Sequence, residues 1–161
     1  MKDIMLDLES MGNKKNAVLC QLGACYFNRV TGEIGPTFKV NIDITSAIRS
    51  GAECDGETIY WWMGQSDAAR ASILAEPRES IQSALLQFNE FAKNATAIWS
   101  HATFDFVTLS EAYKQCDIKP AFSYRTARDI RTLVDLAKVS VSKITRDGLH
   151  HDALDDCKHQ V

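Results

Sequence analysis

The apolar segment at the start of the chain carries two carboxylates on one side, and this constrains the fold more than any other feature. Residues 4–9 read Ile-Met-Leu-Asp-Leu-Glu, which predicts a β-strand. Because successive side chains of a strand point to opposite faces, Ile4, Leu6 and Leu8 share one face, whereas Asp7 and Glu9 share the other. Two like charges held this close raise each other's pKa and are costly to bury unless a cation lies between them. The ordinary explanation for a lone D-x-E pair is a strand end that reaches solvent, so the pair needs further ligands before it indicates a metal site.

A third carboxylate, Asp105, follows the predicted strand 96–100 after a short turn. Sheet domains of the α/β class bind their ligands beyond the carboxyl ends of strands, which makes Asp105 a candidate ligand. The ordinary alternative is a helix over 104–115 capped by Thr103, with Asp105 in the first turn, where the helix dipole favours a negative charge.

The last acidic group lies close to the end of the sequence, in His-Asp-Ala-Leu-Asp-Asp at 151–156. His151 and Asp156 are five residues apart, so one continuous helix could not present both on the same face. Asp152 is a favourable N-cap, and Asp155 three residues later resembles a capping box. We therefore expect His151 in the preceding loop and a helix that begins near Asp152. Helix-start chemistry explains Asp152 and Asp155, which leaves Asp156 as the ligand candidate.

The pattern along the chain predicts a three-stranded meander followed by helices around one further strand. The expected strands are 4–9, 17–28, 34–40 and 96–100, with a hairpin near Gly32, and the expected helices are 58–65, 67–75, 79–94, 104–115, 126–138 and one from about 152. This order is typical of an α/β or α+β domain with helices on the faces of a sheet. We expect residues 1–161 to form one domain, because no repeat or linker divides them.

The charge balance is unusual for a nucleic-acid-binding protein, because the formal net charge is −3. Acids that hold metal ions would themselves make the total negative, so the distribution of charge has to decide. Basic residues that could guide phosphates concentrate towards the end of the chain, and a Lys pair follows the first motif; solvated helix faces explain them equally well. They are Arg125, Arg128, Arg131, Lys138, Lys143, Arg146, Lys14 and Lys15.

The cysteines and the N-terminus indicate a reducing, cytoplasmic setting. The five Cys are scattered and form no C-x-x-C pair, which argues against a disulfide framework and a structural zinc site. The segment MKDIMLDLES places acids where a secretory leader would be apolar. No stretch approaches the length of a membrane span, so we expect no membrane partner.

Taken in order, D-x-E at Asp7 and Glu9, F-D at Asp105 and H-x-A-L-x-D at His151 to Asp156 resemble the three motifs of the DEDDh exonucleases. The set is far more specific than any one member, since order, spacing and helical context must all coincide. The segments Tyr-Trp-Trp-Met-Gly-Gln-Ser and Asp-Ile-Arg-Thr-Leu look more like the ribonuclease T-like subgroup of phage and bacterial genomes than like polymerase proofreading domains. The resemblance implies a ribonuclease-H-like mixed sheet flanked by helices, in bacterial or phage-infected cells.

The resemblance also implies a two-metal mechanism. Asp7 would bridge two Mg²⁺ or Mn²⁺ ions, with Glu9 and Asp156 completing one position and Asp105 holding the other. His151 would take the proton from the attacking water, and a 5′-mononucleotide would leave from the 3′ end of a single strand.

A pocket for the terminal nucleotide would be walled by Leu8, Met11 and Phe104, although these side chains could equally be core. Trp61, expected to be the outward member of the Trp61-Trp62 pair, could stack a base, and Arg125 could contact phosphate. More often such a Trp pair is helix core. One departure from the family stands out: His101 occupies a position where many relatives carry Asn, which leaves its role open.

Several alternatives stay open at the level of sequence. The substrate could be DNA, which we weakly favour, or RNA, because contacts to the 2′-hydroxyl are not visible in a sequence. A catalytically idle nucleic-acid-binding or partner-binding domain on the same fold is a further alternative. The complete set of five residues argues against it, because an idle domain gains nothing from residues that are costly to bury together. A haloacid dehalogenase-type phosphatase would require D-x-D at the first motif. A homodimer is also compatible with the sequence.

Overall fold

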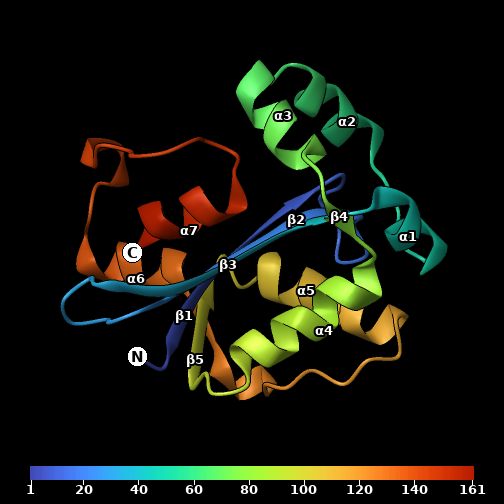
Figure 1. Ribbon diagram of the computed structural model, residues 1–161. Helices are drawn as coiled ribbons and strands as arrows, with labels where there is room; N and C mark the ends of the chain where they lie inside the picture. Colours follow the sequence, from blue (N-terminus) through green and yellow to red (C-terminus); the bar gives the residue numbers. More distant parts are fainter.

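The computed structural model describes residues 1–161, apart from the side chain of Ser142, and is built on a six-stranded mixed sheet (Figure 1). The strand order across the sheet is β4-β3-β2-β1-β5-β6. The strands are β1 (Asp3–Ser10), β2 (Leu19–Phe27), β3 (Ile34–Ile42), β4 (Arg78–Glu79), β5 (Ala97–Ser100) and β6 (Ala127–Asp129). The predicted meander is confirmed, because β1 to β3 pair antiparallel and Gly32 has a positive φ of 72° in the connection between β2 and β3. The expected α/β class with a ribonuclease-H-like sheet is confirmed as well.

Helices cover both faces of this sheet. They are α1 (Ile44–Arg49), α2 (Gly56–Met63), α3 (Asp67–Leu74), α4 (Ile81–Ala92), α5 (Asp105–Gln115), α6 (Ile130–Ala137) and α7 (Ala153–Gln160). Helices α4 and α5 lie against one face, and α6 and α7 lie against the other (Figure 1). Among the described residues, none of these helices is long and apolar enough to cross a membrane.

The alternation predicted for the first strand divides the core as expected. Ile4, Leu6 and Leu8 belong to the large cluster under α4 and α5, whereas Met5 belongs to a smaller cluster that includes Cys157 of α7. The face that carries Asp7 and Glu9 is thus the face that α7 covers.

The expected helix over 126–138 is wrong in its first part. A 3₁₀ turn, Tyr124–Thr126, leads into β6, and α6 begins only at Ile130. Asp129 ends the strand and caps the helix, since its carboxylate accepts a 2.8 Å hydrogen bond from the amide of Thr132. Strand β6 forms because it pairs in parallel with β5, which is a tertiary contact. Three residues are too few to show a periodicity, so the sequence gives no local signal for this strand. Strand β4, of two residues, and helix α1, of six residues, were not expected either.

The expected cap at Thr103 is also wrong. Helix α5 starts after Phe104 without any side-chain cap bond. The carboxylate of Asp105 instead turns back and accepts a 2.9 Å hydrogen bond from the amide of His101.

Helix α7 lies unusually close to strand β2, and Gly23 makes this possible. A Cβ atom on Gly23 would lie only 2.3 Å from the backbone carbon of Ala153 and 2.4 Å from the amide nitrogen of Leu154. The side chain of Gln21 accepts a 2.7 Å bond from the amide of Ala153, and the thiol of Cys157 lies 3.3 Å from the carbonyl of Gly23. Gly23 pairs directly with Asp7 on β1, so this docking sets the distance from α7 to the first carboxylate.

We expect Gly23→Ala to destabilise the protein by about 1–3 kcal/mol, the usual cost of overpacking, because the colliding atoms belong to backbone that cannot rotate away. Urea unfolding measures this change. Gly56→Ala is the matched control, since a Cβ there would meet nothing within 4 Å. Equal stability of the two variants would contradict the close docking of α7.

Candidate active site

The five residues expected at the site come together at one cleft, although they arise from three distant parts of the chain. The cleft has a volume of about 1210 Å³. Strand β1 contributes Asp7 and Glu9, the start of α5 contributes Asp105, and α7 with the loop before it contributes Asp156 and His151. Asp7, Glu9, Asp105 and Asp156 are buried to 8% exposure or less, which is rare for carboxylates.

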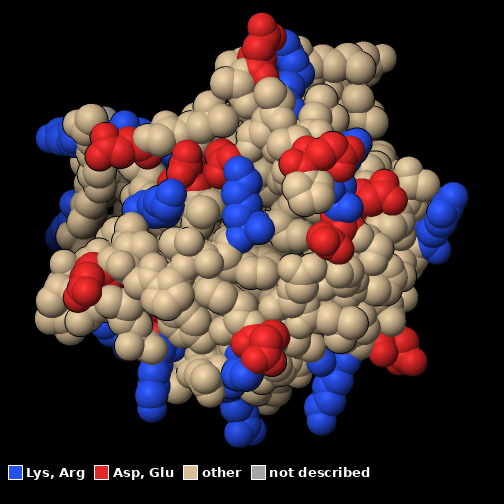
Figure 2. Space-filling view, viewed as in Figure 1, with Lys and Arg blue, Asp and Glu red and all other residues tan. Residues whose placement is uncertain are grey.

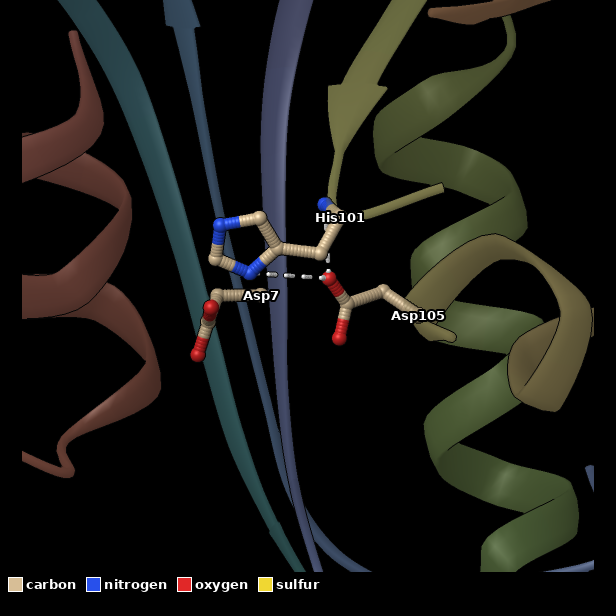
Figure 3. A group of neighbouring side chains, drawn as sticks. All are labelled: Asp7, His101 and Asp105. Atoms are coloured by element: carbon tan, nitrogen blue, oxygen red, sulfur yellow. Dashed lines mark hydrogen bonds and ion pairs between the residues drawn. The ribbon is translucent and has the colours of Figure 1, made fainter. Parts of the chain in front are cut away.

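The potential ligand atoms form two neighbouring triplets. Asp7, His101 and Asp105 form one, and Glu9, His151 and Asp156 form the other; within each triplet the ligand atoms lie within 4.8 Å of one another. Figure 3 shows the first triplet, with the imidazole of His101 directed towards the two carboxylates. Adjacent triplets of hard oxygen donors with a nitrogen donor fit two divalent cations.

The protonation of these carboxylates reflects their crowding. Burial, followed by the charges of Asp105 and Glu9, raises the pKa of Asp7 well above its ordinary value. Burial and then the charge of Asp156 raise the pKa of Glu9 to about 8. Burial raises the pKa of Asp105 to about 7 against the opposing hydrogen bond from His101. Without bound cations the site therefore retains protons that exposed carboxyl groups would have lost.

Polar neighbours hold the carboxylates in place. The side-chain amide of Gln160 on α7 donates a 2.9 Å hydrogen bond to the carboxylate of Asp7, which links the helix to β1. Arg146, in the loop before α7, forms an ion pair with Asp156. A cation thus already neutralises one of the four carboxylates.

His151 lies in the loop before α7, as expected, with a positive φ of 62°. Its ring packs edge-on against Trp61, with 4.7 Å between ring centroids, and lies 3.8 Å from the ring of His150. Burial, and after it the charge of His150, lowers the pKa of the His151 imidazole. The ring is therefore neutral at neutral pH and can accept a proton.

Asp152 fixes the end of this loop. The predicted cap is confirmed, because its carboxylate accepts bonds from the amides of Leu154 and Asp155, each 3.2 Å long. The same carboxylate is paired with Lys39 of β3 and bonded to Ser72 of α3. The carboxylate of Asp155 accepts a bond from the amide of Leu149 instead of closing a capping box. Asp152 thereby anchors the residue after His151 to two other elements.

The residues expected to bind substrate divide into two groups. Leu8, Trp61 and Phe104 line the cleft. Trp61 is 45% exposed whereas Trp62 is buried, which agrees with the expected orientation of the pair. Met11 instead packs against the core, and the exposed Arg125 lies against the ring of Tyr124. Neither residue is among the described residues that line the cleft.

Two residues at the site, His101 and Gln160, had no role assigned from sequence, and the ion pair of Arg146 with Asp156 was not expected either. The departure from Asn was a signal for His101, whereas Gln160 and Arg146 reach the carboxylates only through the tertiary fold. Of the basic residues that could guide phosphate, Arg131, Lys138 and Arg146 line the cleft. Basic and acidic side chains are interspersed over the face seen in Figure 2, so no broad basic patch compensates for the net charge there.

The fold is shared with solved structures of nucleases. Exonuclease I of E. coli in complex with a dT13 oligonucleotide superimposes with a TM-score of 0.66 at 11% identity over 98% of this chain and 39% of that chain. The nuclease domain of 3′hExo, a DEDDh family member bound to rAMP, gives a TM-score of 0.60 at 15% identity over 98% and 86%. Cell-death related nuclease 4 gives 0.63 at 14% identity over 98% and 60%. The chain spans about two fifths of the length of Exonuclease I, and this level of identity indicates the shared fold.

The sequence itself gives a family match. No curated protein matches the chain. The model of a domain family described as the 3′-5′ exoribonuclease Rv2179c-like domain matches residues 2–161. This match confirms the 3′-5′ exonuclease class that the three motifs predicted. The chain belongs to the Rv2179c-like 3′-5′ exoribonuclease domain family.

Proposed function

We propose that residues 1–161 form a single domain that removes nucleotides one at a time from the 3′ end of single-stranded nucleic acid, with two divalent cations. The observation that carries the proposal is the burial of four carboxylates from three distant segments around one cleft, with His151 beside them. When bound, a pair of Mg²⁺ or Mn²⁺ ions would stabilise the charge that develops on the attacking and leaving oxygens. A cytoplasmic location and a homodimer stay predictions.

The four carboxylates would be distributed over two cation positions. Asp7 belongs to the first triplet and is also repelled by Glu9 and Asp156 of the second, so we assign it to both positions; Glu9 and Asp156 would complete one position, and Asp105 would complete the other. Arg146 pairs with Asp156 and lines the cleft, so its guanidinium would also lie within reach of a substrate phosphate.

His151 would act as the general base. It is neutral, lies next to Asp156 and Glu9, and sits in a loop at the wall of the cleft. Its imidazole would accept the proton of the attacking water. The contact with Trp61 and the anchoring of Asp152 orient the ring for this step.

The cleft would hold the terminal nucleotide. Leu8 and Phe104 supply apolar walls, and Arg131 and Lys138 supply positive charge for the backbone of the strand. The solved relatives carry both kinds of sugar, since Exonuclease I binds dT13 and 3′hExo binds rAMP.

A ladder assay tests the proposal directly. Single strands of DNA and RNA labelled at the 5′ end should each be offered with Mg²⁺, Mn²⁺ or EDTA. We expect stepwise shortening from the 3′ end that requires a divalent ion, with 5′-mononucleotides as products. Binding of both strands without cleavage under any ion would indicate an idle binding domain instead.

Metal-dependent stability tests the cation site without any substrate. Because Glu9 shifts from its ordinary pKa of 4.5 to about 8 in the folded chain, folding takes up protons between these values. The free energy of unfolding of the metal-free protein should therefore fall as the pH rises through this window. Millimolar Mn²⁺ should raise the melting temperature, and by more at about pH 8 than at about pH 5.5, since protons compete with the ion.

The Asp7→Asn variant should lose this response to Mn²⁺ and its turnover, while its metal-free form is at least as stable as the unmodified protein at about pH 8 because like-charge repulsion is removed. Asp67→Asn, a change at a carboxylate with a 98% exposed side chain, is the matched control and should retain both properties. Near-native turnover of Asp7→Asn in Mg²⁺ would overturn the shared-ligand assignment.

We expect His151→Ala to lower turnover by about 10²–10⁴, the usual contribution of a general base. Since burial lowers the pKa of His151 below its ordinary value of 6.5, the acid limb of the native pH-rate profile should lie below that value. Stabilisation by Mn²⁺ should persist in the variant. If turnover and the acid limb are unchanged, His151 is not the base, and His150 is the next residue to test.

A further inference from the structure

We propose that His101 is a direct ligand of the cation held between Asp7 and Asp105, through its Nδ1 atom, and that this nitrogen makes the position prefer Mn²⁺ or another first-row transition ion over Mg²⁺. The inference rests on the proposed function, because it assigns a further ligand to one of the two cation positions. It goes beyond the four carboxylates of the DEDDh set.

The geometry brings the imidazole to the right place. His101, Asp7 and Asp105 each offer a ligand atom within 4.8 Å of the others. The Nδ1 atom of His101 lies 4.0 Å from a carboxylate oxygen of Asp105 (Figure 3). Ligands about 2.1 Å from one octahedral ion lie about 3–4.2 Å from each other, so only a small contraction is needed to enclose a cation.

The contact between His101 and Asp105 is not itself a hydrogen bond. At 4.0 Å, the two atoms are too far apart for one, and the imidazole side chain is 32% exposed to the cleft. The facing Asp105 side chain is only 4% exposed, so its charge is removed from water without a direct partner in the ring. A cation between the two groups would satisfy both.

The backbone around His101 is held in place. Its amide donates a 2.9 Å bond to Asp105, and its carbonyl accepts bonds of 2.8 Å and 2.9 Å from the amides of Phe104 and Asp105. The next amide, that of Ala102, donates a 3.0 Å bond to Asp129. The turn between β5 and α5 is therefore fixed on both sides, which holds the backbone of His101 beside Asp105.

The nature of the donor determines the preferred ion. Carboxylate oxygens suit Mg²⁺ and Mn²⁺ alike, whereas Mg²⁺ demands hard oxygen ligands in a nearly ideal octahedron. Imidazole nitrogen favours transition ions over Mg²⁺. An Asn at this position would offer an amide oxygen or nothing, so the change to His alters the class of donor while preserving the position.

Electron spin echo spectroscopy of the protein loaded with one equivalent of Mn²⁺ tests the ligand directly, because a coordinated ¹⁴N modulates the echo. We expect this modulation in the unmodified chain and in His151→Ala, and its loss in His101→Asn. Titration of both ions should show Mn²⁺ binding weakened about 10- to 100-fold in His101→Asn, a range known for residues that support metal ligands. Mg²⁺ binding should change by less than about threefold.

The outcomes separate this proposal from the proposed function. Modulation that survives in His101→Asn, that is absent from the unmodified chain, or that disappears in His151→Ala while His101 is intact would overturn the role of His101 but leave the two-cation nuclease standing. A chain that binds neither ion would overturn the proposed function. The metal-free melting temperature reports on folding, and His101→Gln provides a second variant if His101→Asn does not fold.

Discussion

The close docking of helix α7 on strand β2 is the contact on which the site depends. Gly23 has no side chain, so the helix backbone can lie directly on the strand. Gly23 is also the cross-strand partner of Asp7. Since Asp156 and Gln160 lie on α7, the same contact places one carboxylate beside another and supplies the amide that bonds Asp7. A larger side chain at one position of the sheet would thus separate groups that are about 150 residues apart in sequence.

The crowded carboxylates destabilise the folded chain when no cation is bound. Burial together with mutual repulsion raises the pKa of Asp7, Glu9 and Asp105, so the metal-free fold either retains protons or sacrifices stability. The remainder of the molecule tolerates this because the apolar face of β1 packs against a continuous core under α4 and α5. The two faces of β1 therefore have opposite effects on stability. The apolar face stabilises the sheet, whereas the acidic face carries a like-charge repulsion that a bound cation would relieve.

The distribution of charge matters more than its total. The chain is acidic overall, yet Arg131, Lys138 and Arg146 line the cleft next to the carboxylates. Arg146 forms an ion pair with Asp156, and Lys39 forms one with Asp152. Cations bound between the acids would invert the local sign and make the cleft attractive to phosphate. Net charge alone therefore argues neither for nor against a nucleic-acid substrate.

Several features could be derived from the sequence because their signals are local. The alternation of β1 determined which side chains share a face with Asp7 and Glu9, and the five-residue spacing of His151 and Asp156 required the break that Asp152 caps. The order of the three motifs was sufficient to indicate the 3′-5′ exonuclease class. Strand β6 could not be derived, because three residues become a strand only by pairing with β5. The roles of Gly23, Arg146 and Gln160, the placement of Met11 in the core and the ring contact between Trp61 and His151 were decided by the tertiary structure alone. Local periodicity reports the face on which a side chain lies, whereas its partner across the molecule is set by how separate elements pack, and that packing leaves no trace in the spacing of residues along the chain.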